Sequence, residues 1–324
     1  CGSGATRAAG GMLSPLGEDL HPPAFLALGQ RSLSLFPEFV AALEAETGAE
    51  VGYRTSGKLE VAFTPEEAEH LRDLVERHSA MGRDIQFLGA AAVGDRIPSV
   101  RGRAIAGAWI PGDHVVDNRL LAAALRRACD LRGVEILEGA TVDRVDSAGG
   151  VVSGVTTLDG RSFLAPRVVL AAGAWGASVG GLPRPLPLRP VRGQMLSVEG
   201  APPHSEVIAT ARAYLVPRVD HLIVGATSEE VGFREELTPE GQAALLNGLL
   251  EVYPDLGSRP IREQWVGYRP ATPDGLPILG EDPELSGLIH ATGHFRNGIL
   301  LTPITVAALG PALSLIHISE PTRQ

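Results

Sequence analysis

Apolar residues recur every three or four positions in several segments of the chain, which is the spacing of an amphipathic helix. Residues 23–47 show this spacing over the longest stretch. Residues 64–67, with the sequence Thr-Pro-Glu-Glu, predict a second helix start, because they combine an N-cap, a proline at the first helical position and a capping-box glutamate. Asp117 is expected to cap a helix that ends at Gly133, and Thr238 another.

Shorter apolar or alternating runs between these helices predict strands. Residues 51–54 and 58–63 are expected to form a hairpin around Ser56-Gly57, and residues 134–137 a buried strand with a parallel partner. Residues 142–164 predict a small antiparallel meander with glycine-containing turns. Further strands are predicted at 104–110, 167–173, 194–198, 214–217, 221–226, 261–266 and 287–292.

The order of these elements predicts an α/β fold in which two domains are built from separated segments. We assign residues 1–50, 112–185 and 271–312 to one domain with strand–helix repeats. Residues 51–111 and 186–270 are assigned to a second domain, which carries a mixed, antiparallel-rich sheet. A chain of 324 residues can bury two such cores, and a ligand is expected between them.

Composition narrows the classes of partner. The formal net charge is -10 and the basic residues are scattered, so no nucleic-acid partner is expected. Lys58 is the one lysine among many arginines, and Cys1 and Cys129 are the two cysteines, too few for a disulfide framework. The sequence has neither an export signal nor an apolar run long enough for a membrane span. We therefore expect a cytoplasmic protein without membrane contact.

Several chemistries lack their usual motifs. The nine histidines are dispersed without metal-ligand spacing, so no metal is expected. No nucleophile elbow is expected, and the chain contains neither GxxxxGK[ST] nor a GxGxxG after a predicted strand. The sequence thus offers no side chain as a catalytic acid or base.

The run from Gly293 to Pro303 lies where the strand at 287–292 should lead into a helix from Ile299 to Leu309. Free main-chain amides at a helix start favour an electron-rich ligand. Two glycines flank an arginine and an asparagine here, which is costly in an ordinary turn. A helix-start loop with a solvated arginine explains the same pattern, and both interpretations stay open.

Arg269 is predicted to lie between the strand at 261–266 and a proline-containing loop. A guanidinium fixed at a domain boundary can bind one carboxylate through two parallel hydrogen bonds. An ion pair with Asp274 is the alternative. The phenol of Tyr214 could support such a clamp, although a core tyrosine with a satisfied hydroxyl is the more frequent case.

Five phrases carry a family resemblance when they are taken in order. They are residues 2–6 with 10–13, 171–175, 225–229, 265–275 and 293–303. Together they resemble the D-amino-acid oxidase family of FAD-dependent oxidoreductases, and within it the glycine oxidases of thiamine biosynthesis. The resemblance extends to about residue 310.

The resemblance implies a Rossmann-like FAD-binding domain with an inserted substrate domain. It places Arg269, Arg296 and Tyr214 in the substrate pocket, and Val142 near the adenine half of FAD through its main chain. The residues implied beside FAD are Ala5, Thr6, Gly10, Gly11, Met12, Val142, Gly173, His294, Phe295, Arg296, Asn297, Gly298, Ile299 and Leu300.

The implied activity is oxidative deamination of glycine or another small amino acid. A hydride would pass from Cα to flavin N5, giving an imine that thiamine biosynthesis would use, and the reduced flavin would pass its electrons to oxygen, giving hydrogen peroxide. Sarcosine oxidase and D-amino-acid dehydrogenase are alternatives within the family. A non-catalytic flavoprotein-like binding subunit, or an inactive fragment, is the alternative from another class, and a homo-oligomer is left open.

Both ends of the chain depart from the family pattern. The first βαβ unit of the family, with its GxGxxG, is expected upstream of Cys1, so we expect an N-terminally truncated fragment that binds FAD poorly. Residues 313–324 are expected to be a non-native tail that is excluded from the fold.

Overall fold

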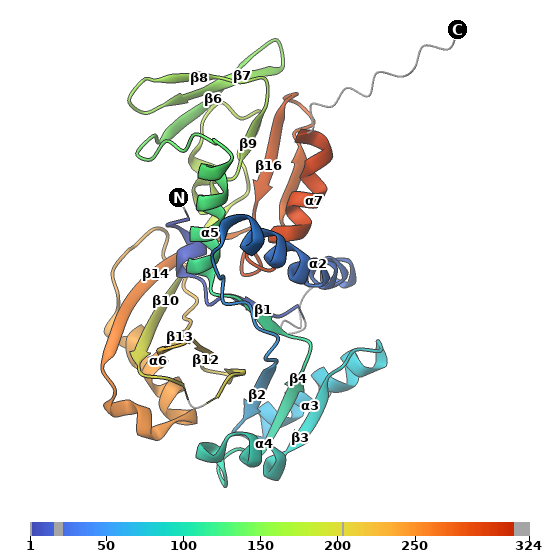
Figure 1. Ribbon diagram of the computed structural model, residues 1–324, viewed down its shortest axis with the longest axis vertical. Helices are drawn as coiled ribbons and strands as arrows, with labels where there is room; N and C mark the ends of the chain where they lie inside the picture. Colours follow the sequence, from blue (N-terminus) through green and yellow to red (C-terminus); the bar gives the residue numbers. More distant parts are fainter. Residues whose placement is uncertain (1, 16–21, 203, 314–324) are drawn as a thin grey trace.

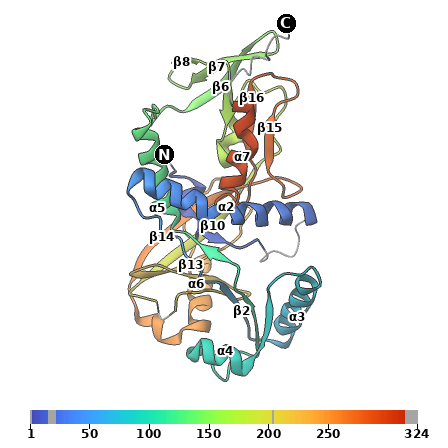
Figure 2. The same ribbon diagram turned by 45° about the vertical axis from the view of Figure 1, so that its right-hand side comes forward.

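The computed structural model describes residues 2–15, 22–202 and 204–313, and for 311–313 the main chain alone. Cys1 and the predicted tail after Leu313 lie outside the described residues. The molecule is elongated, with an eight-stranded sheet at one end and two three-stranded sheets at the other (Figures 1 and 2). No helix among the described residues combines the length and the apolar character needed to cross a bilayer.

The eight-stranded sheet is mixed, because neighbouring strands are antiparallel except for the parallel pair β11 and β2. Its strands come from the two segments that we assigned to the second domain, although the domain boundaries themselves stay a prediction. In sheet order the strands are β14 (Ile261–Ala271), β10 (Arg189–Glu199), β13 (His221–Gly225), β12 (Tyr214–Pro217), β11 (Val207–Ala209), β2 (Lys58–Ala62), β4 (Ala106–Ile110) and β3 (Gln86–Gly89).

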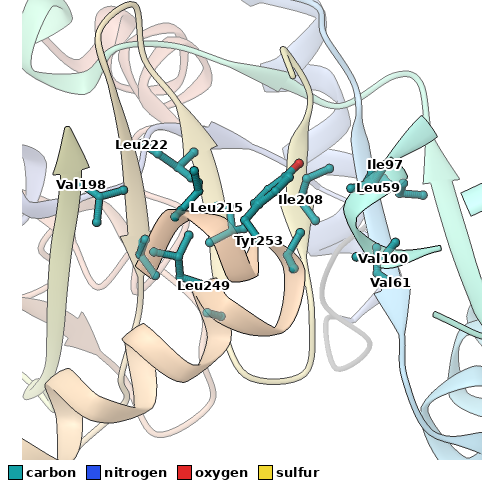
Figure 3. Packing of buried hydrophobic residues seen from close by; sticks show 14 of the residues in the cluster. Leu59, Val61, Ile97, Val100, Val198, Ile208, Leu215, Leu222, Leu249 and Tyr253 are labelled. Carbon is teal, nitrogen blue, oxygen red and sulfur yellow. The ribbon is translucent and has the colours of Figure 1, made fainter. Parts of the chain in front are cut away.

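One face of this sheet packs on helix α6 (Pro239–Val252). Figure 3 shows Leu215 and Leu222 of the sheet close to Leu249 of α6, all of them fully buried. Farther along the sheet, Leu59 and Val61 pack with residues around helix α4 (Ala90–Arg96) and the short helix η1 (Pro98–Val100). Helix α3 (Pro65–Ala80) covers part of the sheet with its own apolar cluster. This burial leaves the other face of the central strands available to form a cavity.

The opposite end of the molecule has two three-stranded sheets with helices beside them (Figure 1). One sheet has the order β15-β16-β9 and the other is the meander β6-β7-β8. Helix α2 buries Phe36 and Val40 against Leu121 of α5 and Ile299. The elements here are α2 (Pro23–Thr47), α5 (Asn118–Leu131), α7 (Thr302–Leu313), β6 (Val142–Ala148), β7 (Val151–Thr157), β8 (Ser162–Leu164), β9 (Val168–Leu170), β15 (Ile278–Glu281) and β16 (Leu288–Thr292).

Short elements connect the two ends. Strand β1 (Met12–Leu13) pairs with β5 (His114–Val115), and helix α1 (Ala5–Ala8) packs on β14. The close approach of α1 requires Gly267, since a Cβ there would come 2.3 Å from the Cβ of Ala8. Two further 3-10 helices are η2 (Gly173–Ser178) and η3 (Pro254–Ser258).

Most predicted helix starts are confirmed. Helix α2 spans residues 23–47 as the periodicity predicts, and α3 begins with a complete capping box between Thr64 and Glu67. Asp117 caps α5 and Thr238 caps α6 through their side chains. These boundaries were predictable because each depends on residues within one turn of the helix.

Two predicted strands are wrong. Residues 51–54 do not form a hairpin with β2, because their main-chain groups bond to 115–117 instead: the amide of Arg54 donates to the carbonyl of Val115 at 2.8 Å. Residues 134–137 form no strand, and Val134 and Leu137 are 50% and 43% exposed. A strand requires a neighbour to satisfy its main-chain groups, and no described strand lies beside this run.

Two element boundaries near the predicted site differ from those expected from the sequence. Strand β14 continues to Ala271, so Arg269 lies within a strand rather than after one. The pairing of β14 with β10 extends across Pro270, which explains why the proline does not end the strand there. Helix α7 begins at Thr302, three residues after the expected start, because Ile299–Leu301 form turns.

Candidate functional site

A cavity of about 750 Å³ lies between the N-terminal loop, the eight-stranded sheet and the loop after β16. It is lined by residues from segments more than 280 positions apart in sequence, such as Ala5 and Arg296. Most of the predicted site residues meet here. They are Ala5, Thr6, Gly10, Gly11, Met12, Gly173, Tyr214, Arg269, His294, Phe295, Arg296, Asn297, Gly298 and Ile299.

Two predicted residues lie outside the lining of this cavity. Val142 begins β6 in the meander and is 36% exposed. Leu300 is buried in the core with α2, and its carbonyl accepts a hydrogen bond of 2.6 Å from Ser32 Oγ. The cofactor contacts expected of both residues stay predictions.

Arg269 enters the cavity from β14, opposite Val191 of β10. Its Nη1 donates to the carbonyl of Thr227 at 3.1 Å and to the carbonyl of Arg192 at 3.4 Å. The guanidinium lies over Gly193, where a Cβ would come 2.6 Å from Nη1. The sheet and one loop therefore fix the plane of the guanidinium, as a carboxylate clamp requires. Asp274, the alternative partner, accepts a hydrogen bond from the amide of Leu276 at 3.0 Å.

Tyr214 approaches the same space from β12. Its ring occupies the volume that a side chain on Gly225 would need, because a Cβ there would come 2.5 Å from Cζ. Its hydroxyl donates to Met195 Sδ at 3.4 Å. Burial raises the pKa of the Tyr214 phenol, although the positive charges of Arg269 and Arg296 act to lower it. The phenol is therefore protonated at neutral pH, and its single O–H can donate to a ligand only by turning away from the weak acceptor Met195 Sδ.

The loop after β16 also lines the cavity, from His294 to Ile299. The amide of Phe295 donates to the carbonyl of Pro270 at 3.1 Å, which ties the loop to the end of β14. Phe295 has a φ of 49°, an uncommon conformation for a residue with a side chain. The guanidinium of Arg296 lies 5.3 Å from the centre of the Phe295 ring. These contacts hold the loop against the end of β14, with Arg296 in the lining of the cavity.

His294 is neutral in this loop. Burial lowers its pKa to about 4, and its Nε2 lies 3.0 Å from Thr305 Oγ1 of helix α7. A neutral imidazole with this partner supports the loop and brings no positive charge into the cavity at pH 7.

The cavity fits a flat group with hydrogen-bond acceptors on its edge, such as a flavin ring. In the described part of the chain nothing accepts a hydrogen bond from the amides of Gly298 and Ile299, and both residues line the cavity. Such amides attract electron-rich ring atoms. Gly173 has a φ of 57° and faces open space, so a ligand can approach its main chain closely. The small residues Ala5 and Ala8 leave room on the other side.

Lys58, Glu60 and Ser14 also line the cavity, and sequence reasoning did not predict them. Lys58 Nζ is 2.7 Å from Glu60 Oε1 and 3.6 Å from Asp113 Oδ2. Burial raises the pKa of Asp113 to about 6, although the Lys58 ammonium opposes this rise. The one signal in the sequence was that Lys58 is the chain's single lysine.

The geometry supports neither a nucleophilic serine nor a metal site among the described residues. A Gly-Ala-Ser-Val-Gly run at 176–180 resembles a nucleophile motif, but it lies at the end of η2 and Ser178 is exposed. Within residues 2–15, 22–202 and 204–313 no group of three or more His, Cys, Asp or Glu side chains could hold a metal ion.

The fold is a mixed α/β fold with a ligand-sized cavity between the N-terminal loop, the eight-stranded sheet and the loop after β16. The chain belongs to the family of FAD dependent oxidoreductases, whose pattern matches residues 1–309. The cofactor of this family is FAD, as the sequence resemblance implied. The expected α/β fold with a mixed sheet is confirmed.

Relatives support the assignment within the family. The chain is 39% identical over 335 residues to the bifunctional protein ThiO/ThiG of Trichormus variabilis, covering 99% of this chain and 50% of that protein. It is 37% identical to a glycine oxidase of Geobacillus kaustophilus, covering 94% of this chain and 81% of that protein. The crystal structure of glycine oxidase from Geobacillus kaustophilus has a TM-score of 0.88 at 33% identity, over 95% of this chain and 84% of that one. The chain spans about half the length of the bifunctional relatives that it matches.

Proposed function

We propose that the protein oxidises glycine or another small α-amino acid with FAD, giving an imine and hydrogen peroxide, and that this reaction serves thiamine biosynthesis. The observation that carries the proposal is the meeting of Arg269, Tyr214 and Arg296 in a single cavity with the loop 293–299. The names of the relatives, glycine oxidase and ThiO/ThiG, agree with this chemistry.

Arg269 would bind the substrate carboxylate through its guanidinium fork, and the Tyr214 phenol would donate a further hydrogen bond. Two donors from different strands fix both the position and the direction of a small amino acid. Arg296 adds positive charge from the loop after β16. The chain's main contribution to the rate is therefore orientation of the Cα–H bond, with no side chain needed as a base.

The amino group must lose its extra proton before oxidation. Tyr214 cannot accept that proton because its raised pKa keeps the phenol protonated, so water is the acceptor in this proposal. When bound, FAD supplies the acceptor for the hydride on Cα and passes the two electrons to oxygen. Overall, one amino acid and one dioxygen give one imino acid and one hydrogen peroxide. The imine is then either captured for thiamine synthesis or, after release, hydrolysed by water to an oxo acid and ammonia.

The walls that would hold FAD are the loop of Gly10, Gly11 and Met12, the main chain at Gly173, and the loop 293–299. The small N-terminal residues Ala5 and Thr6 would lie beside the same cofactor. We further propose a cytoplasmic site of action, supported by the low cysteine content. The oligomeric state stays a prediction.

Peroxide formation tests the proposal directly. The full chain, supplied with FAD, is incubated with glycine, sarcosine or D-alanine under air, and hydrogen peroxide is measured. Fastest production with glycine is the expected result. Flavin reduction without peroxide would indicate a dehydrogenase, and sarcosine as the best substrate would indicate a sarcosine oxidase. If FAD binds and none of the three amino acids reduces it, the catalytic proposal is wrong and a binding role replaces it.

A further inference from the structure

We propose that Thr227 and Glu229 are positioning residues for the Arg269 guanidinium, so that carboxylate affinity depends on a hydrogen-bonded network behind the cavity. Neither residue lines the cavity, and both act through Arg269. The proposal rests on the proposed function in one respect, namely that Arg269 binds the carboxylate of the ligand.

Arg269 Nη1 donates to two main-chain carbonyls, those of Arg192 and Thr227. Different contacts hold these two carbonyls in position. The carbonyl of Arg192 belongs to β10, which pairs with β14 along most of its length. The carbonyl of Thr227, the closer acceptor at 3.1 Å, lies beyond the end of β13. Its position therefore depends on contacts other than the regular sheet.

The Thr227 side chain provides those contacts. Its Oγ1 accepts a hydrogen bond from the amide of Gln194 at 2.8 Å and donates to Glu229 Oε1. The amide of Thr227 donates to the carbonyl of Gln194 at 3.2 Å. The segment is thus joined to β10 by main chain and hydroxyl together, and loss of the hydroxyl would remove two of these bonds.

Glu229 joins the same network through its charge. Its carboxylate accepts from Gln194 Nε2 at 2.8 Å and pairs with the guanidinium of Arg192. Burial opposes ionisation of Glu229, but hydrogen bonds from Thr227, Arg192 and Gln194 outweigh it and lower the pKa. A carboxylate that is ionised at neutral pH and held by three donors is a fixed anchor for the Thr227 hydroxyl.

Arg192 and Gln194 extend the network to helix α6. Arg192, 3% exposed, donates from Nη1 to the carbonyl of Glu236 at 2.8 Å. Gln194, fully buried, accepts from the amide of Thr238, the N-cap of α6, at 2.9 Å. Because the network joins three segments, namely β10, residues 227–229 and residues 236–238, it has little freedom to shift. The carbonyl that orients Arg269 is therefore tied to the core of the sheet and to α6.

Paired substitutions at Thr227 test the proposal. Thr227→Val removes the hydroxyl at nearly constant volume, whereas Thr227→Ser retains it. Thr156→Val is the matched control, because Thr156 also donates its hydroxyl to a carboxylate, Asp146 Oδ2, at 2.5 Å, in the meander outside the cavity. The full chain is used with FAD present, and the dissociation constant of acetate, a carboxylate that cannot be oxidised here, is measured by calorimetry.

We expect Thr227→Val to weaken acetate binding about tenfold, since a small misplacement of a binding group has effects of this size or larger. Thr227→Ser should stay within about twofold of the wild type, and Thr156→Val should match it. FAD affinity should be unchanged in all three variants, which a general loss of structure would not allow. Equal weakening by valine and serine, or no weakening by valine, would overturn the proposal.

If Thr227→Val fails to fold, Glu229→Gln gives an independent test. It keeps an acceptor for the Thr227 hydroxyl and removes the charge that anchors it, so acetate binding should weaken again. Unchanged acetate affinity in this variant would also overturn the proposal. A wild-type protein that binds acetate and oxidises no amino acid would contradict the proposed function alone, whereas a wild type that binds no acetate would overturn the positioning role as well.

Discussion

The Arg269 guanidinium lies directly over Gly193, in space that no other residue type at position 193 would leave free. A Cβ at position 193 would come 2.6 Å from Nη1 and 2.9 Å from Cζ of Arg269. Such a contact would be closer than carbon and nitrogen atoms tolerate. The flexible end of the Arg269 side chain would then have to move. Gly193 thus leaves the space that the Arg269 guanidinium occupies.

Gly193→Ala should therefore displace the clamp. We expect a rise of about tenfold in the KM for glycine, because the guanidinium loses its alignment with the carboxylate. Steady-state kinetics of peroxide formation measures this change. Gly89→Ala is the control, since a Cβ on Gly89 would meet nothing within 4 Å. An unchanged KM in Gly193→Ala would contradict the role given to this contact.

Arg269→Lys should reduce kcat/KM for glycine by about a hundredfold, which corresponds to roughly 2.7 kcal/mol. A lysine keeps the charge but lacks the planar fork that donates to carbonyls and carboxylate at once. The measurement is kcat/KM together with the dissociation constant of acetate. Arg101→Lys, in an exposed ion pair with Asp95, should have little effect. Wild-type kinetics in Arg269→Lys would show that the carboxylate binds elsewhere.

His294 should make stability depend on pH. Its pKa is about 4 in the folded protein against an ordinary value of 6.5, so between these values the unfolded chain binds a proton that the folded one does not. The free energy of unfolding should therefore fall as the pH drops from 6.5 towards 4. Between pH 7 and pH 5 the protonation of His294 in the unfolded chain should lower the free energy of unfolding by about 2 kcal/mol.

Urea unfolding of wild type and His294→Gln at the two pH values measures this contribution. The wild type should lose about 2 kcal/mol more than the variant between pH 7 and pH 5, because glutamine has no proton to gain. His70→Gln, at an exposed position on α3, is the control. Equal losses in wild type and His294→Gln would show that His294 is not held neutral.

Thr64→Ala should destabilise the protein by about 1 kcal/mol. The Thr64 hydroxyl accepts from the amide of Glu67 at 3.3 Å, and the Glu67 carboxylate accepts from the amide of Thr64 at 3.3 Å. Alanine removes one half of this capping box at the start of α3. Urea unfolding at pH 7 measures the loss, and Thr55→Ala, at an exposed position, should be near neutral. A neutral Thr64→Ala would show that the cap contributes nothing to α3.

Elements with local signals were predicted well. The capping residues of α3, α5 and α6 lie next to the turns they stabilise, and the meander β6-β7-β8 has its turns at the predicted glycines. Gly149 and Gly150 both have positive φ, which is the conformation that makes glycine the residue of choice in such turns. Caps and turns of this kind can be predicted from a few consecutive residues.

Elements that need a distant partner were predicted less well. Residues 51–54 and 134–137 have the composition of strands, yet neither belongs to a sheet. Apolar composition is compatible with several pairings, and the hydrogen-bond partner decides among them. The same holds for Lys58, whose contact with Asp113 joins positions 55 residues apart and could not be inferred from spacing.

The sequence by itself determined the helix starts, the turns, the family resemblance and the residue types able to bind a carboxylate. Tertiary structure alone decided that Arg269 lies over Gly193, that Tyr214 fills the space beside Gly225, and that the carbonyl of Thr227 accepts a hydrogen bond from Arg269. The physical reason is that capping and turn formation are local, whereas a binding site depends on strand register and close packing between segments far apart in the chain.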